Sequence, residues 1–108
     1  MRSEMKVSMD RFQAAVEAAI DSIPEAFQTY LENTQFVIEP RSKEGLLGLY
    51  EGATALEAGE WLPERVTIYK AEHESEAETW EELVEEVKRT ILHEVGHHFG
   101  MEEDDLPY

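Results

Sequence analysis

The segment from Thr79 to Gly100 constrains the fold of this sequence more than any other. Thr79 and Glu82 form a Thr-x-x-Glu capping box, whose side chains satisfy backbone N–H groups at the start of a helix. Apolar residues then recur at helical spacing, namely Trp80, Val84, Val87, Ile91 and Val95. Gly100 is suited to a left-handed stop. We therefore predict a helix from Thr79 to about His98 that buries one face in a core.

On this helix His93 and His97 lie one turn apart, opposite the apolar stripe, and Glu94 is one step round from His93. Imidazoles at positions i and i+4 can reach the same ion, and H-E-x-x-H is a known zinc-binding spacing. Zinc lowers the pKa of a bound water to about 7, and Glu94 would accept its proton as general base. The alternative is that two histidines decorate an exposed helix face. We predict one Zn²⁺ ion held by His93 and His97, with Glu94 as the catalytic residue.

The third metal ligand is expected from the short tail after His97 or from upstream. A left-handed Gly100 would turn the chain back, so that a side chain three positions on faces the metal. This favours Glu103, which completes the pattern H-E-x-x-H-x-x-G-x-x-E. Glu102 and Asp104 stay open as alternatives, because a one-residue change in the turn would exchange them.

Two helices are predicted before the first strand. Ser8 is suited to cap a helix whose apolar face comprises Phe12, Val16, Ala19, Ile20 and Ile23. Pro24 interrupts this helix and can begin a shorter one that carries Phe27, Tyr30 and Leu31 and stops near Asn33.

Three β-rich segments are predicted as strands, namely 35–39, 46–52 and 65–70. Gly48 inside the second marks a bulge or a close approach of another backbone. In the third, Val66 and Ile68 alternate with Thr67 and Tyr69, which indicates one buried face. Residues 41–45 are turn-like and 52–64 lack periodicity. The acidic run 71–78 is predicted to be a charged loop with His73 on the surface.

Composition limits the possible partners. The chain has 108 residues, which suits a single domain (1–108), and it holds 25 acidic against 9 basic residues for a net charge of -16. That excess opposes nucleic acid and anionic membranes, and it favours cationic peptides or metal ions. There are no cysteines, so thiolate zinc sites and disulfides are excluded. No stretch approaches the roughly 20 apolar residues of a membrane span, and we expect a cytoplasmic protein.

The sequence resembles the minimal zincins, small bacterial proteins similar to metallopeptidases. HEVGHHFGMEEDDL, with EELVEEVKRTIL before it, carries the resemblance, and SIPEAFQTYLENTQFVIEP, LLGLYEG and LPERVTIYK extend it from about Phe12 to Leu106. It implies an α+β fold, in which a small mixed β-sheet packs with an N-terminal helix and a C-terminal active-site helix. It also implies His93 and His97 as zinc ligands, Glu94 as general base and Glu103 as the acidic third ligand. The methionine turn and lower subdomain of larger zincins are missing.

The function expected from these features is that of a zinc-dependent metallopeptidase acting on extended peptides in an open groove. If strand 65–70 is an edge near the helix, it would hold substrate by strand addition. Tyr50, Tyr69 and Tyr108 are candidate oxyanion donors. The alternative is a zinc-binding interaction module of the same fold with little or no turnover. The oligomeric state is left open.

Overall fold

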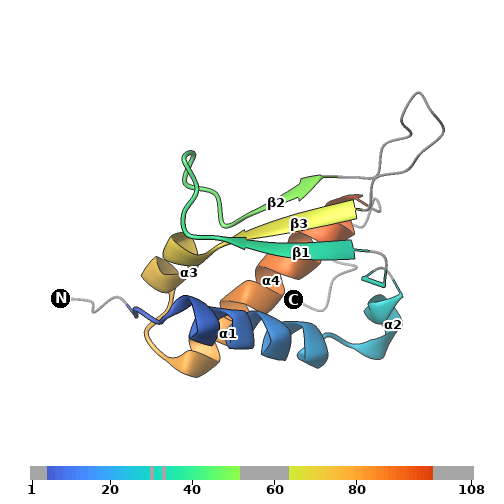
Figure 1. Ribbon diagram of the computed structural model, residues 1–108. Helices are drawn as coiled ribbons and strands as arrows, with labels where there is room; N and C mark the ends of the chain where they lie inside the picture. Colours follow the sequence, from blue (N-terminus) through green and yellow to red (C-terminus); the bar gives the residue numbers. More distant parts are fainter. Residues whose placement is uncertain (1–4, 30, 33, 52–63, 99–108) are drawn as a thin grey trace.

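Helices and strands enclose one core in the computed structural model, which describes residues 5–29, 31–32, 34–51 and 64–98 (Figure 1). Along this part of the chain the elements are α1 (Met9–Ser22), α2 (Glu25–Gln28), β1 (Thr34–Glu39), β2 (Gly48–Glu51), β3 (Glu64–Tyr69), α3 (Lys70–Glu76) and α4 (Trp80–His98). The α+β class agrees with the prediction, because a small mixed sheet packs with an N-terminal helix and a C-terminal helix. The expected excursion at 52–64 falls almost entirely outside the described residues.

The strand order of the sheet is β1-β3-β2. β1 runs parallel to β3, with Phe36 opposite Val66, and β2 runs antiparallel to β3, with Gly48 opposite Ile68. The three predicted strands are therefore present, although the second begins only at Gly48. Segment 65–70 does not meet the condition of being an edge strand, because β3 is hydrogen-bonded on both sides. Among the described strands, the edges are β1 and β2.

The central position of β3 also explains its burial. Val66 and Ile68 are fully buried against the helices, as the alternation predicted. Thr67 points to the other face, yet it is only 6% exposed. Val37 and Leu49 stand directly opposite Thr67 on the two neighbouring strands, and side chains in register cover one another.

α1 and α4 pack on the same face of the sheet (Figure 1). Ser8 caps α1 as predicted, because its Oγ accepts a hydrogen bond from the Arg11 amide at 3.1 Å. The apolar faces of the two helices meet strand β3 in one core, whose buried members are Phe12, Ala15, Val16, Ala19, Ile23, Leu31, Val66, Ile68, Ala77, Leu83, Val87, Ile91, Leu92 and Val95.

The predicted second helix is the single turn α2, with Pro24 at its N-cap. Gln28 links it to α1, because its Nε2 donates to the carbonyl of Ile20 at 3.0 Å and to that of Ile23 at 2.9 Å. The bond to Ile23 gives an acceptor at the end of the helix a donor, and the bond to Ile20 adds to the one that its carbonyl accepts from the Ile23 amide at 3.2 Å. Tyr30 and the predicted stop at Asn33 lie outside the described residues.

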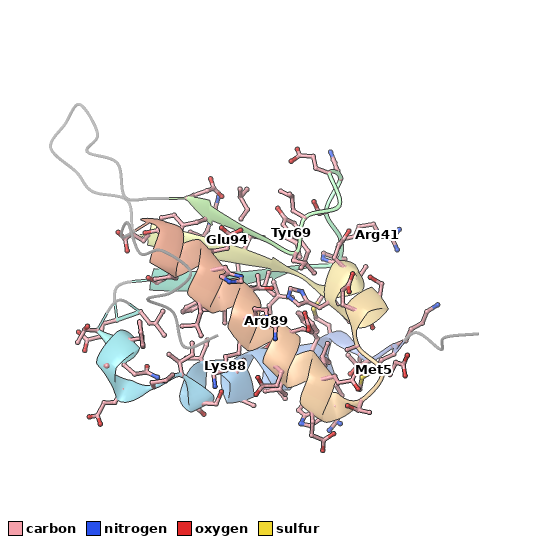
Figure 2. The ribbon with its side chains drawn as sticks, turned by 180° about the vertical axis from the view of Figure 1, so that it is seen from behind. Met5, Arg41, Tyr69, Lys88, Arg89 and Glu94 are labelled. Atoms are coloured by element: carbon pink, nitrogen blue, oxygen red, sulfur yellow. The ribbon has the colours of Figure 1, made fainter. Side chains whose placement is uncertain are left out.

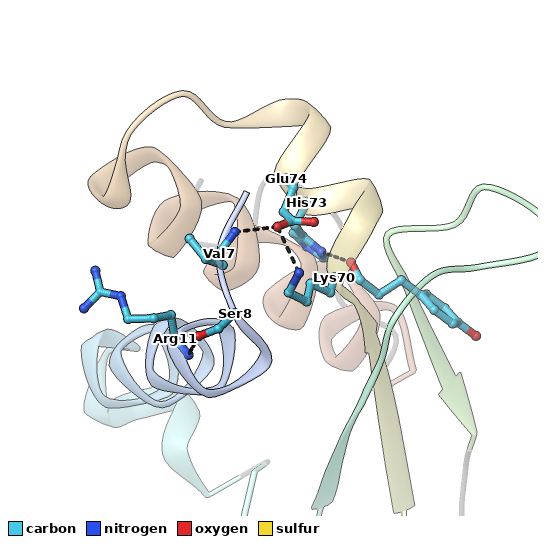
Figure 3. A network of polar contacts seen from close by, with 7 residues as sticks. Val7, Ser8, Arg11, Lys70, His73 and Glu74 are labelled. Carbon is cyan, nitrogen blue, oxygen red and sulfur yellow. Dashed lines mark hydrogen bonds and ion pairs between the residues drawn. The ribbon is translucent and has the colours of Figure 1, made fainter. Parts of the chain in front are cut away.

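The acidic run predicted as a loop contains helix α3, and this prediction is wrong. Lys70 Nζ lies 3.0 Å from Glu74 Oε2, one turn further on, and the same Oε2 accepts a hydrogen bond from the Val7 amide at 2.7 Å (Figure 3). Glu72 accepts from the Ser42 amide at 3.1 Å. The carboxylates of Glu72 and Glu74 therefore bind neighbouring backbone amides. The helix was not predicted, because its residues are polar at most positions and show no apolar period.

Candidate metal centre and substrate groove

The start of α4 is fixed by its capping residues. Thr79 Oγ1 accepts a hydrogen bond from the Glu82 amide at 3.1 Å, and Glu82 Oε1 accepts one from the Glu78 amide at 3.2 Å. The box is thus present, with its return bond one residue earlier than in the standard pattern. From this start the helix continues unbroken to His98. Positions 93 and 97 therefore lie one turn apart on one helix, as the sequence predicted.

His93 and Glu94 open onto a groove between α4 and strand β2. Both side chains are half-buried. The groove has a volume of about 230 Å³ and is lined by Leu46, Leu47, Gly48, Glu86, Arg89, Thr90, His93 and Glu94. Figure 2 shows Glu94 on the side of α4 that faces the strands. The helix thus buries one face and presents the other to a groove, in agreement with the predicted division.

Gly48 is where strand β2 and helix α4 come closest. A Cβ atom at this position would lie 2.6 Å from Thr90 Cγ2, 3.3 Å from the Thr67 carbonyl oxygen and 3.5 Å from Glu94 Cγ. The close approach predicted for Gly48 is therefore confirmed, and the partner that approaches is a helix. Because the glycine lacks a side chain, Glu94 can lie directly against the strand.

The remaining predicted ligands are only partly described. His97 belongs to α4, but its side chain lies outside what the structure describes, as do Glu103 and its alternatives Glu102 and Asp104. Among the described side chains, no group of three or more histidines and carboxylates could hold a metal ion. The described part still fits zinc, because it places a half-buried imidazole in the groove with a second histidine position one turn on.

The predicted surface position of His73 is wrong. This residue is fully buried between α3, α4 and α1, where its ring lies 5.9 Å from that of Phe12. Its Nδ1 lies 2.7 Å from the Tyr69 carbonyl oxygen and its Nε2 lies 2.8 Å from Thr90 Oγ1 (Figure 3 shows the first contact). Since a carbonyl only accepts, Nδ1 carries the proton. Thr90 Oγ1 also lies 3.0 Å from the Glu86 carbonyl oxygen, so its single proton is shared between that carbonyl and Nε2 of the neutral ring. His73 thereby fixes a residue that lines the groove.

Burial lowers the pKa of His73 below its ordinary value of 6.5. The hydrogen bond to Tyr69 and the charges of Glu72 and Glu76 act in the opposite direction without overcoming it. The neutral ring is therefore the form that suits this site.

Neither of the two described tyrosines considered as oxyanion donors, Tyr50 and Tyr69, lines the groove. Tyr69 lies on the opposite face of the sheet, in a hollow that it shares with Val37 and Leu49. Burial raises the pKa of Tyr50, and the hydrogen-bonded carboxylate of Glu64 raises it further. Tyr108 lies outside the described residues.

Arg89 lines the groove from α4, which makes it a functional candidate. It was not identified from the sequence. Its place four residues before His93 on one helix was the available signal.

Comparison with known proteins identifies the family. The sequence profile of the zincin-like metallopeptidases matches residues 14–108. A solved structure of a conserved hypothetical protein from T. thermophilus is similar to this chain at 27% identity and a TM-score of 0.60, covering 86% of this chain and 94% of that one. No curated protein matches the sequence. In the described helices, none is long and apolar enough to cross a membrane. The profile match spans most of the chain and includes its H-E-x-x-H helix, and the chain therefore belongs to the family of zincin-like metallopeptidases.

Proposed function

We propose that this protein hydrolyses peptide bonds with one zinc ion held by His93, His97 and Glu103. One observation carries the proposal: His93 and Glu94 both line the groove between α4 and strand β2. A ligand and a base on successive residues then reach the same space, which is the arrangement that metal-assisted hydrolysis requires. Family membership supports the same chemistry.

In the proposed hydrolysis, the zinc ion and the side chains of the groove have separate roles. Zinc, when bound, acidifies water to a pKa of about 7 and polarises a carbonyl group. The Glu94 carboxylate accepts the proton of the attacking water and delivers it to the leaving amine. Arg89 lines the same groove and offers a positive charge to the oxygen that becomes negative during attack. Thr90, fixed by the buried His73, keeps this face of the helix in place against β2.

An extended peptide is the substrate that fits this groove. β2 is an edge of the described sheet, so it takes the role that was considered for strand 65–70. A substrate strand that pairs with β2 would run along the groove in front of Glu94. Gly48 contributes only backbone at that point, which lets Thr90 and Glu94 of α4 lie directly against the strand that would pair with the substrate.

The test is cleavage of a diverse peptide library by the zinc-loaded protein, followed by mass spectrometry. Glu94→Gln is expected to lower turnover by about 10²–10⁴-fold while zinc binding persists, because general acid–base catalysis contributes that much. Glu86→Gln is the matched control, since Glu86 lines the same groove from the same helix. It should change turnover by no more than about twofold. Cleavage that is unaffected by Glu94→Gln refutes the assignment of the base.

A second function is favoured by the size of the groove. Its volume of about 230 Å³ falls below the ~300–1,000 Å³ typical of small-molecule sites. A zinc-binding interaction module with little or no turnover fits so small a groove. Zinc at one equivalent in the protein, together with no cleavage of any library peptide, identifies the module. Failure of His93→Ala to weaken zinc binding excludes both functions.

A further inference from the structure

A second groove lies between α1 and strand β1, on the edge of the sheet away from β2. It has a volume of about 470 Å³, twice that of the groove beside Glu94. It is lined by Met9, Gln13, Val16, Glu17, Ile20, Phe36 and Ile38. In Figure 1 helix α1 runs alongside β1, and Phe36 and Ile38 are the residues of β1 that line the groove. Its floor and walls are mainly apolar, and Met9 is 40% exposed.

β1 is an edge of the described sheet along this groove. It is hydrogen-bonded to β3 on one side, and no other described strand pairs with it. In a strand, backbone groups alternate in direction, so half of those in β1 face away from β3. The lining of α1 extends from Met9 to Ile20, about 16 Å at 1.5 Å per residue. That length accommodates a strand of about five residues at 3.3 Å each.

Nothing in the sequence of β1 blocks this edge. Natural edges are protected by lysine, proline, bulges or inward-pointing charges. The strand reads TQFVIE, without lysine or proline. Its inward residues Phe36 and Ile38 are both apolar and line the groove. An added strand would therefore place alternate side chains between them and α1, as in peptide recognition by strand addition.

The charges around the groove select the partner. Asp10, Glu17 and Asp21 are exposed on α1, where Glu17 lines the groove, and Glu39 is exposed on the other face of β1. Arg11 is the only base in these two elements, and it lies over the Trp80 ring, 4.4 Å from its centroid. The rim is thus acidic. A second copy of this chain carries the same net charge of -16 and would be repelled.

We propose that the groove between α1 and β1 binds an extended, positively charged peptide segment of another protein, which pairs with β1 as an additional strand. Apolar side chains at alternate positions fill the groove. Lysine or arginine residues between them lie on the other face of the added strand, as Glu39 does on β1, and those at its ends lie near the carboxylates of α1. This surface is separate from the groove beside Glu94, and the proposal holds whether or not the protein cleaves peptides.

The binding test uses a fluorescein-labelled peptide of alternating lysine and valine, with fluorescence anisotropy as the readout. The protein is the full chain with Glu94→Gln, so that hydrolysis does not consume the probe. Glu17→Lys is expected to weaken binding by about fivefold or more, because it reverses a charge on the rim. Glu44→Lys makes the same change of charge on the exposed β1–β2 connection, and it should leave the affinity within about twofold.

A second pair of variants tests the position of the peptide. Met9→Lys and Leu49→Lys alter two hydrophobic side chains of nearly equal exposure, 40% and 39%, one on α1 in the groove and the other on strand β2 away from it. Met9→Lys is expected to weaken binding by about fivefold or more, and Leu49→Lys by less than about twofold. Both variants should keep the thermal stability of the parent, because both positions are exposed.

Three results would overturn the proposal. In the first, a peptide with alternate N-methylated amides, which cannot pair with a strand, binds as well as the parent peptide. In the second, a matched glutamate–valine peptide binds equally well. In the third, the protein sediments as a dimer, the substitution Met9→Lys dissociates this dimer, and the unsubstituted protein does not bind the probe. The occupant of the groove would then be a second copy of the chain.

Discussion

Replacing Gly48 by alanine is expected to separate strand β2 from helix α4. The new Cβ would lie 2.6 Å from Thr90 Cγ2, whereas carbon atoms in contact prefer about 3.5–4.0 Å. About 1 Å of separation must therefore open. Thr90 cannot easily turn away, because its Oγ1 is held 2.8 Å from His73 Nε2. Overpacking of this kind costs about 1–3 kcal/mol.

A smaller effect acts in the opposite direction. Alanine restricts the unfolded chain and stabilises by about 0.4–1 kcal/mol where the backbone suits it. Gly48 has no positive φ, unlike Gly45 at 74°, so its backbone does suit alanine. The net loss is then about 1–2 kcal/mol, which lowers Tm by roughly 4–15 °C in a domain of this size.

The variant Thr90→Ser tests whether the contact with the Thr90 methyl causes the cost of Gly48→Ala. It removes the Cγ2 methyl that the new Cβ meets and keeps the hydroxyl that His73 binds. In this background Gly48→Ala should cost nothing or should stabilise slightly. Urea denaturation of the four proteins, followed by circular dichroism, should give a coupling energy of about 1–2 kcal/mol at constant m-value. An equal cost of Gly48→Ala in both backgrounds would refute the contact between methyl and Cβ as the reason for glycine.

Two further predictions concern the buried histidine and the helix cap. Because the pKa of His73 is lowered on folding, the unfolded state binds its proton more readily. Metal-free protein should therefore lose stability as the pH falls below about 6.5 toward the folded-state pKa, and His73→Gln should remove this part of the loss. If the free energy of unfolding has the same slope against pH in the unsubstituted protein and in His73→Gln, this role of His73 is contradicted. Thr79→Ala should cost about 1 kcal/mol, because the Glu82 amide loses its acceptor, whereas Thr79→Ser should retain most of the stability. Equal losses in both variants, measured by urea denaturation, would exclude the cap.

The α4 prediction was accurate because its causes are local. The capping box, the 3.6-residue apolar period and the H-E-x-x-H spacing lie within one helix, and each constrains the backbone through near neighbours. The same reasoning placed α1 from Ser8 and the turn before β2, where Gly45 adopts a φ of 74°. Gly48 also carried a local signal, since a glycine inside a strand indicates that something else occupies the space of its side chain.

The errors arose where contacts are distant in sequence. The run 71–78 is polar at almost every position, so no apolar period indicated that His73 and Glu74 would be buried. Their burial depends on partners at Thr90 and Val7, 17 and 67 residues away, which satisfy the polar atoms. The central position of strand 65–70 was not predicted, because alternation shows which face is buried and does not show which strands are neighbours.

The sequence by itself determined where most of the helices and strands lie and that His93, Glu94 and position 97 share one helix. These features follow from backbone preferences and side-chain periods within a few residues. Only the tertiary structure decided that β3 lies between β1 and β2, which leaves β2 as the edge beside Glu94 and β1 as the edge beside α1. It also decided that His73 is buried in the core, where it contacts Thr90, a residue that lines the groove beside Glu94. Strand order and burial depend on which surfaces meet, and that choice minimises the exposed apolar area of the whole chain rather than of any one segment.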